Sequence, residues 1–573
     1  MHSIAPLPVV VPLGTAALLL MFGTVLPDRA ARALAIAAML TETALAAALV
    51  RGARAGPVIY WFGGWTPRHG VAIGVSFAVD RLGAGAATFA GLIVTAAALT
   101  AAHSFKDRVA LTHALMLTML AAMAGFCLTG DIFNLFVFYE LMAVSAFGLA
   151  AYSTAQVTSL RAALNFAITN SVGAFLFLIG IALLYGRTGA LNLAQIGRDL
   201  AKSHVDGLVI VAITTITVGL LVKAAIVPFH FWLVDVASWG SLPLVVVLGG
   251  ILDTLAVYAL ARVYWTVFAP ALAAHDGSLR GILIVMGATT ALVGAALSLI
   301  VRGARRVVAF VMVSHTGTLL VGIGCLTAFG IAGAAIYAVA GGAIKAAVVT
   351  CVGELDDDRQ PTRPLAGPIV LLALCGLALA GLPLFGTALG ESVIERSGAT
   401  IGDAWIAPAL ILASVFTGAA VLRIALAAAR NREARLRAPA VAIVATMLVG
   451  LAIVARFALS RWVAGAAAAF VASTAYGRVV LNGAKFASPA AVRGVGLPTS
   501  GAVTDLIAVA VALGLVAWLD MLRPMTRRRT AELGGTTVGN AVRRLHNGSL
   551  GDSVAWVTVG ATAIVVTLAM SMH

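Results

Sequence analysis

Charge is scarce in this sequence. Only 11% of its 573 residues are Asp, Glu, Lys or Arg, whereas 61% are hydrophobic. Soluble proteins cover their exterior with polar and charged groups, so this composition excludes soluble enzymes, nucleic-acid binders and secreted disulfide scaffolds. A mean hydropathy of +1.03 indicates a chain whose apolar surface faces a lipid bilayer.

Cysteines and cofactor motifs are scarce as well. Cys127, Cys325, Cys351 and Cys375 lie within apolar runs, without a C-x-x-C pattern or a histidine at ligand spacing. They are predicted to be small buried hydrophobic residues, with no metal site and no disulfide. Because the sequence also has no nucleotide-binding loop, haem ligand set or iron–sulfur pattern, we expect this chain to bind no cofactor.

Long apolar runs dominate what is present. About sixteen runs of about 20 residues, bounded by charged or turn-forming residues, follow one another along the chain. The runs are continuous rather than alternating, which favours a helical bundle over a β-barrel. The predicted fold class is therefore an all-α polytopic membrane protein.

The basic residues give a net charge of +15 and lie mainly in short loops, as in the Arg302–Arg306 cluster. This is the positive-inside pattern of membrane proteins rather than a nucleic-acid-binding patch. It predicts an amino terminus that faces outward, with Arg51, Arg54 and Arg68 as exceptions on the outer side. We therefore expect a lipid bilayer, and no nucleic acid, around the chain.

Two apolar runs contain a proline near their middle, Pro228 and Pro383, each close to ionisable residues. A proline removes a backbone donor, and the carbonyl that it frees must be satisfied by protein or water. Broken helices at comparable places in two halves of a chain are typical of transport folds built from inverted repeats. A simple kink is the alternative for either proline alone.

Ionisable residues within apolar runs are the candidate functional residues, because a charge at the bilayer centre costs about 2.5 to 3.5 kcal/mol. The predicted proton relay consists of Glu140, Lys223, His230, Asp253, His315, Lys345 and Glu391. Burial and pairing shift proton affinities in opposite directions, so a lysine or carboxylate that exchanges partners takes up and releases protons. Histidine titrates near neutral pH and can bridge such a path.

Several of these residues also have a purely structural alternative. Asp253 could only accept hydrogen bonds, for example from Thr254, and both histidines could serve packing alone. Asp80 and Asp131 lie near the beginnings of apolar runs. They are predicted to pair with a cation or to cap a helix rather than to carry protons.

Five motifs in this order resemble the proton-translocating antiporter-like family. That family includes the large Mrp cation/proton antiporter subunits, above all those of the D type, the matching subunits of membrane-bound hydrogenases, and the large membrane-arm subunits of respiratory complex I. The motifs are LTGDIFNLFVFYELM (128–142), VKAAIVPFHFWL (222–233), RRVVAFVMVSHTG (305–317), AIKAAVVTCVGEL (343–355) and AGLPLFGTALGE (380–391). They carry Glu140, Lys223 with His230, His315, Lys345 and Glu391, respectively.

The resemblance implies a core of about fourteen helices with two inverted five-helix repeats and two broken helices, followed by about two extra carboxyl-terminal spans. The expected parts are amino-terminal helices (1–108), a first repeat broken at Pro228 (109–265), a second repeat broken near Pro383 (279–428), and carboxyl-terminal helices with an interfacial segment and a last span (438–573). The resemblance also implies that Glu140 and Lys223 form a switching pair, with Lys345 as the central relay and Glu391 at the exit.

The sequence departs from the family's pattern near the centre of the path. Thr254 occupies the position of a usual lysine, and Asp253 precedes it. Ala340 and Gly341 replace a histidine pair, and His315 stands where many relatives have glutamine. Either Asp253 substitutes a carboxylate for the central amine, or conduction has been partly lost.

The function predicted from these residues is that of a proton-translocating membrane subunit in a multisubunit cation/proton antiporter or respiratory-type complex. We expect no bond chemistry in this chain. The alternative is a non-conducting anchor subunit of a membrane hydrogenase or NADH:quinone oxidoreductase. The expected partners are other membrane subunits and protons, with Na⁺ or another monovalent cation, and the expected location is the plasma (inner) membrane of a prokaryote.

Overall fold

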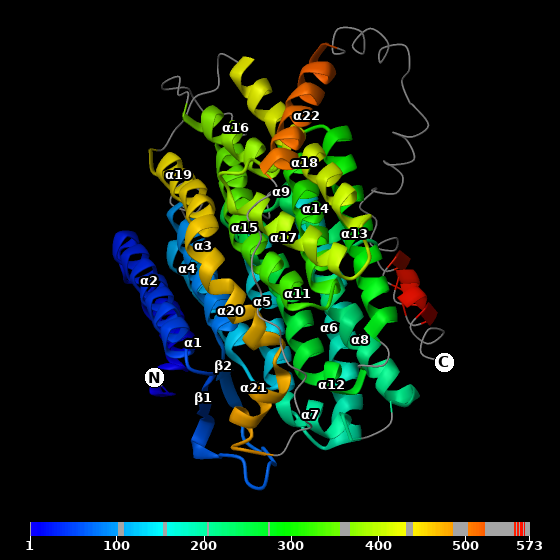
Figure 1. Ribbon diagram of the computed structural model, residues 1–573. Helices are drawn as coiled ribbons and strands as arrows, with labels where there is room; N and C mark the ends of the chain where they lie inside the picture. The colour runs from blue at the N-terminus through cyan, green and yellow to red at the C-terminus, as the bar shows by residue number, and fades with distance from the viewer. Residues whose placement is uncertain are drawn as a thin grey trace.

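The computed structural model describes most of the chain, and helices make up nearly all of it (Figure 1). The described residues are 2–100, 108–152, 157–202, 205–272, 276–355, 367–430, 439–484, 502–521 and single positions between 555 and 567. In these ranges thirteen helices are long and apolar enough to cross a membrane. The predicted helical, multi-pass fold class is confirmed. The last predicted span, near 552–571, lies mostly outside the described residues.

The amino-terminal part contains three membrane-length helices and a small hairpin. Its elements are η1 (His2–Ile4), α1 (Leu7–Phe22), α2 (Asp28–Gly52), β1 (Val58–Trp61), η2 (Phe62–Gly64), β2 (Ser76–Val79) and α3 (Arg81–Thr100). The two strands pair antiparallel, with Val58 opposite Val79. This hairpin departs from the all-α expectation, because its β-branched and aromatic residues pair between two spans. Phe77 of β2 also forms a backbone bridge to Thr129.

The middle of the chain forms the first half of the bundle. Its helices are α4 (Val109–Leu128), α5 (Ile132–Ala150), α6 (Val157–Thr188), α7 (Leu193–Leu200), α8 (Gly207–Lys223), α9 (Phe231–Trp239), α10 (Leu242–Val247), η4 (Leu248–Leu252), α11 (Asp253–Val263), η5 (Tyr264–Phe268) and α12 (Ala269–Leu272). The elements η4 and η5 are π-helical turns within one long span. Such turns occur often at functional sites, and η4 ends directly before Asp253.

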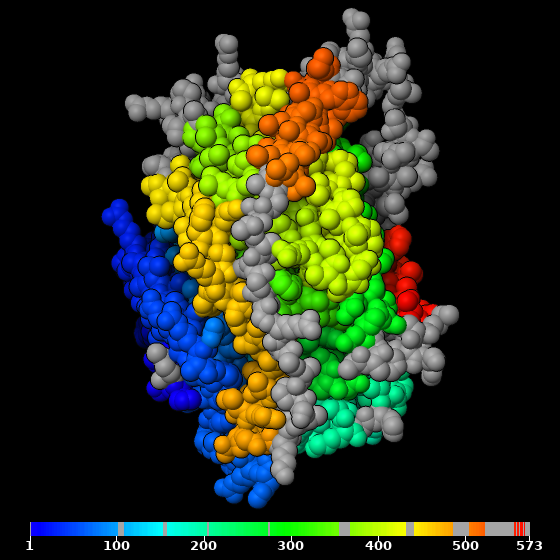
Figure 2. All heavy atoms as spheres, viewed as in Figure 1, coloured from blue at the N-terminus to red at the C-terminus, as the bar shows by residue number. Residues whose placement is uncertain are grey.

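The remaining helices complete the bundle and cover one of its faces. They are α13 (Asp276–Ile300), α14 (Ala304–Gly324), α15 (Ala328–Leu355), α16 (Gly367–Leu379), α17 (Gly386–Thr400), α18 (Ile406–Arg430), α19 (Pro439–Val454), η6 (Ala455–Leu459), α20 (Ser460–Val471), α21 (Ser473–Val480) and α22 (Ala502–Met521). Figure 2 shows α19 and α20, in yellow and orange, running down this face beside the blue amino-terminal helices. The predicted interfacial segment thus begins as a continuation of α19.

Both predicted helix breaks are present. The first span ends at Lys223 and resumes as α9 at Phe231, and the second ends at Leu379 and resumes as α17 at Gly386. Backbone groups freed by a break must find partners in a membrane. The Trp232 indole N–H donates to the Val222 carbonyl at 2.9 Å, and the Thr387 hydroxyl donates to the Ala378 carbonyl at 2.6 Å.

Glycines bring the central helices into close contact. An added Cβ at Gly219 of α8 would lie 2.5 Å from the Gly173 carbonyl of α6. At Gly317 of α14 it would lie 2.3 Å from the Ala291 amide of α13. Membrane helices gain no hydrophobic driving force from one another, so such close van der Waals packing stabilises the bundle.

The aspartates at the beginnings of spans have the predicted structural roles. Asp131 caps α5 by accepting the Asn134 amide at 2.8 Å. Asp80 accepts the Gly83 amide at 2.8 Å and forms a buried ion pair with Arg262. The four cysteines are buried, as predicted.

Candidate functional site

The predicted relay residues are buried inside the bundle, with one exception. The exposed fractions are 0% for Asp253 and Lys345, 2% for Lys223 and His315, 4% for His230 and 6% for Glu391, whereas Glu140 is half-buried. Ionisable side chains in the interior of a membrane protein are costly and mark ion or proton pathways. The structure divides these residues into three groups.

The central group is a fully buried ion pair. The Lys345 ammonium of α15 lies 3.1 Å from Oδ2 of Asp253 at the start of α11, and neither side chain has any exposed surface. The carboxylate also accepts hydrogen bonds from the Thr254 amide at 2.7 Å and the Thr254 hydroxyl at 3.1 Å. The Thr316 hydroxyl of α14 lies 3.1 Å from Oδ2 and donates to it. Thr254 therefore donates two hydrogen bonds to the carboxylate beside it.

The first group surrounds Lys223, at the end of α8 and directly before the break. The Lys223 ammonium lies 4.3 Å from the centre of the Tyr139 ring, a cation–π contact. Its Nζ has no hydrogen-bond partner in the described part of the chain. The Tyr139 hydroxyl lies 3.4 Å from the Gly219 carbonyl, which ties α5 to α8.

Glu140 follows Tyr139 on α5 but does not contact the lysine directly. The two charges interact electrostatically, although no ion pair within 4.0 Å joins Glu140 to Lys223. The structure therefore brings the predicted switching pair into the same region without a direct ion pair, while the Lys223 ammonium contacts the Tyr139 ring.

One of the two histidines, His315, belongs to α14, and the other, His230, lies near it. The His230 ring, at the beginning of α9, is 6.5 Å from the ring of Phe310 in α14. The His315 ring stacks on Tyr337 of α15 at 4.5 Å, with Nε2 3.3 Å from the Tyr337 carbonyl. His315 also interacts electrostatically with Lys345, so it belongs to the central group.

Gly341 makes room for the His315 ring. An added Cβ at Gly341 would lie 2.1 Å from Nε2 of His315. Glycine at position 341 of α15 therefore leaves space for an imidazole that comes from α14.

Replacing Gly341 by alanine should destabilise the protein by about 1 to 3 kcal/mol, the usual cost of overpacking a close-packed site. Adding His315→Ala removes the clash, so the double variant should be more stable than Gly341→Ala alone. Gly450→Ala is the matched control, because an added Cβ there meets nothing within 4 Å. The measurement is the melting temperature in detergent. An unchanged melting temperature in Gly341→Ala would contradict this packing.

The third group lies after the second break. Glu391 on α17 accepts a short hydrogen bond from the Ser414 hydroxyl of α18. Glu395, one turn further along α17, and Asp505 of α22 interact with it electrostatically. Three carboxyl groups from two helices therefore act on one another here, and the exit residue predicted from the sequence is the most buried of them.

These groups lie on neighbouring helices. The helix α8 packs against α11, α11 against α14, α14 against α15, and α15 against α17. A chain of packed elements therefore connects Lys223, the Asp253–Lys345 pair and Glu391. No cluster of three or more histidine, cysteine, aspartate or glutamate side chains within the described ranges has a geometry that could hold a metal ion.

Sequence reasoning missed one buried carboxylate. Glu42 of α2 is fully buried, and neither of its oxygens has a hydrogen-bond partner in the described structure. The neighbouring Thr43 hydroxyl donates to the Met39 carbonyl instead. The signal was present, because Glu42 stands inside a predicted apolar span. The roles of Thr316 and Tyr139 had no comparable signal.

The fold and the site together define a polytopic helical membrane protein with two broken helices and a buried series of ionisable groups. Residues 129–417, half of the chain, match the transmembrane family of NADH:quinone oxidoreductases and Mrp antiporters. The chain belongs to this family, as the motifs predicted.

Individual relatives come from several kinds of complex. The chain is 29% identical to the NADH-quinone oxidoreductase subunit N of Desulforudis audaxviator, over 54% of this chain and 60% of that protein. It is also 29% identical to the D-type subunit of a probable K⁺/H⁺ antiporter of Rhizobium meliloti, over 64% of this chain and 73% of that protein. The match thus spans less than two thirds of the first relative's length.

Solved structures share the fold. A chain of the Mrp complex from Dietzia sp. superposes with a TM-score of 0.74 at 24% identity, over 84% of this chain and 100% of that chain. A chain of an archaeal membrane-bound sulfane sulfur reductase gives a TM-score of 0.72 at 23% identity, over 83% and 99%. This fold occurs in multisubunit membrane complexes.

Proposed function

We propose that this chain is a proton-conducting, antiporter-like subunit of a multisubunit cation/proton antiporter or respiratory-type complex in the plasma membrane of a prokaryote. The observation that carries the proposal is Lys223. Its buried ammonium has no hydrogen-bond partner in the described structure, lies against an aromatic ring beside a helix break, and has a carboxylate, Glu140, nearby. A buried unpaired amine costs stability, so its presence requires a function.

The proposed path uses Glu140 and Lys223 as the gate, His230, His315 and the Asp253–Lys345 pair as the centre, and Glu391 as the exit. Proton arrival at Glu140 weakens its hold on Lys223, and the lysine then shares or passes a proton toward the centre. The division into two inverted repeats remains part of this proposal, since each half contains one broken helix. Relatives named Na⁺/H⁺ and K⁺/H⁺ antiporter subunits support a monovalent cation as the coupled ion of the complex.

Glu140→Gln should slow proton uptake by the reconstituted complex about tenfold or more, equivalent to about 1.4 kcal/mol on the barrier. The glutamine keeps the shape of the side chain but cannot change its charge, so it cannot alternately attract and release the Lys223 ammonium. Uptake is measured with a pH-sensitive dye in vesicles, under Na⁺ and K⁺ gradients in turn. Asp28→Asn, an exposed carboxylate at the start of α2, is the control.

A non-conducting anchor subunit is the second candidate function. The observation that favours it is the Asp253–Lys345 pair. Both oxygens of this carboxylate accept hydrogen bonds, so the pair can hold α11 and α15 together without carrying protons. If Glu140→Gln and the wild type move protons at the same rate in assembled complexes, this second function holds and the relay does not.

A further inference from the structure

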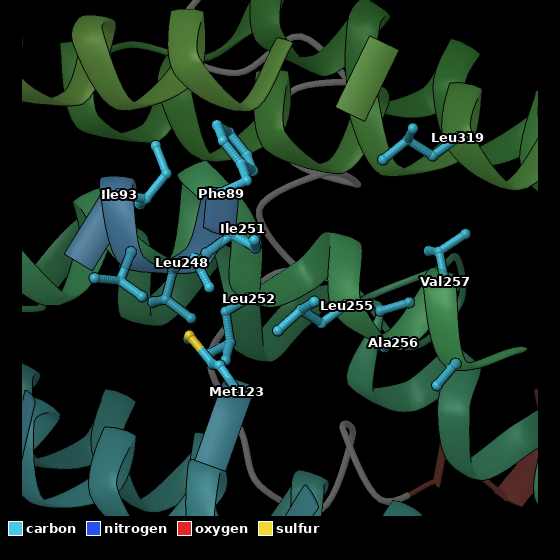
Figure 3. Close-up of a cluster of buried hydrophobic side chains, with 14 of the residues drawn as sticks. Phe89, Ile93, Met123, Leu248, Ile251, Leu252, Leu255, Ala256, Val257 and Leu319 are labelled. Atoms are coloured by element: carbon cyan, nitrogen blue, oxygen red, sulfur yellow. The ribbon is translucent and has the colours of Figure 1, made fainter. Parts of the chain in front are cut away.

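A cavity of about 590 Å³ lies beside the central ion pair. Its wall comes from α2, α3, η4, α11, α14, α15 and the α19–α20 segment, and is almost wholly apolar. Figure 3 shows Phe89, Ile251, Leu255 and Leu319, four of the side chains that line it. The volume falls within the range of about 300 to 1,000 Å³ that is usual for ligand sites.

One end of this cavity is basic. Arg51 and Arg54, at the carboxyl end of α2, line the cavity and are exposed. Neither side chain forms an ion pair or hydrogen bond with any described residue. Arg81 donates hydrogen bonds to the carbonyls of Ala53 and Arg54, so a third cation is fixed at the same end.

These arginines also have no explanation in the loop-charge pattern. Arg51 and Arg54 are exceptions to the positive-inside rule in the orientation that the other loops predict. Two cations on the disfavoured side that have no partner among the described residues indicate a specific anionic partner. The partner must also have an apolar part, because the cavity that begins at these cations is lined by aliphatic and aromatic side chains.

We infer that the cavity binds an anionic phospholipid, with one acyl chain inside it and the headgroup phosphate on Arg51 and Arg54. Arginine is well suited to bidentate binding of phosphate, and basic pockets between membrane helices bind anionic headgroups. Trp462 of α20, on the cavity wall and partly exposed, suits the boundary between chain and headgroup. A free phosphate would leave the apolar space unfilled, and a neutral lipid or quinone would leave the cations unpaired.

The bound chain also has a consequence for the centre of the protein. Thr254 lines the cavity and donates to Asp253, so only one residue separates the cavity from the buried ion pair. An acyl chain there keeps water away from that side of the pair. This consequence rests on the proposed function, whereas lipid binding itself does not.

The test is lipid analysis of the protein purified within its complex from native membranes in mild detergent. Arg51→Gln/Arg54→Gln should retain about tenfold less anionic phospholipid than the wild type. Arg29→Gln/Arg396→Gln removes two exposed arginines that do not line the cavity and should retain it fully. Ala335→Phe narrows the cavity without a charge change and should also lose the lipid. Equal retention by wild type and both cavity variants would overturn the inference.

A second measurement distinguishes an anionic phospholipid from free phosphate, quinone and neutral lipid as the ligand of the cavity. Added phosphatidylglycerol should raise the melting temperature of the delipidated wild type but not that of Arg51→Gln/Arg54→Gln. Inorganic phosphate should not reproduce the rise, because it cannot fill the apolar cavity. An equal rise with inorganic phosphate, or recovery of a quinone or neutral lipid that is lost in Ala335→Phe, would overturn the assignment to an anionic phospholipid.

Discussion

Lys345→Met should destabilise the protein by about 3 to 5 kcal/mol, because it leaves a fully buried carboxylate without its cation. Asp253 has no exposed surface and cannot recover the lost pairing from water. Methionine fills nearly the same volume as lysine, so the loss comes from the charge and not from a cavity. The measurement is the free energy of unfolding in detergent, followed by circular dichroism.

The double variant Asp253→Leu/Lys345→Met is the decisive control for this result. Replacing both members of a buried ion pair by apolar residues is often neutral, or stabilising by about 1 to 4 kcal/mol. We therefore expect the double variant to recover most of the stability that Lys345→Met loses. Proton uptake should be absent in both the single and the double variant, since each lacks Lys345, the proposed central relay. A double variant as unstable as the single one would show that Asp253 and Lys345 are not coupled.

Lys223→Met should give the opposite combination, an abolished proton uptake with little change in stability. The Lys223 ammonium contacts the Tyr139 ring but has no hydrogen-bond partner within the described ranges, so its removal breaks no hydrogen bond, and the carboxylate that interacts with it, Glu140, is only half-buried. We expect the unfolding free energy to change by less than about 1 kcal/mol, since one cation–π contact is worth about that much and desolvation of the amine opposes it.

The conduction part of this prediction has a matched control in Lys202→Met. Lys202 is exposed, lies 3.4 Å from Asp199 and is remote from the breaks, so its loss should leave uptake unchanged. Lys223→Arg is a further discriminating variant. An arginine keeps the charge but does not release its proton, so it should fold and not conduct. Wild-type uptake in Lys223→Met would remove the observation on which the proposed function rests.

The contrast between these two lysines shows what the sequence could not provide. Both stand inside apolar motifs, and both are predicted as relays for the same reason. Lys345 is paired with a carboxylate 92 residues away in the chain, whereas Lys223 contacts an aromatic ring on another helix. Residue type and hydropathy depend only on neighbouring positions in the sequence. They therefore indicate the free-energy cost of burying a charge, but not which distant residue offsets that cost.

Local chemistry did predict several other features correctly. The breaks at Pro228 and Pro383 follow from proline's missing donor, and the cap at Asp131 follows from its place before an apolar run. The hairpin of β1 and β2, the π-helical turn before Asp253 and the position of His315 over Gly341 were not predicted. Each depends on contacts between segments that lie far apart in the chain.

The sequence by itself determined the bilayer as solvent, the helical class, the broken spans, the family and the short set of residues that carry charge into the membrane. Those properties follow from composition and motif, because an apolar solvent permits few backbone structures and tolerates few charges. Only the tertiary structure decided that Asp253 pairs with Lys345, that Lys223 has no hydrogen-bond partner among the described residues, and that a basic-ended cavity lies against Thr254. Electrostatic energy depends on the distance and burial of particular atoms, and the packing of the helices sets both.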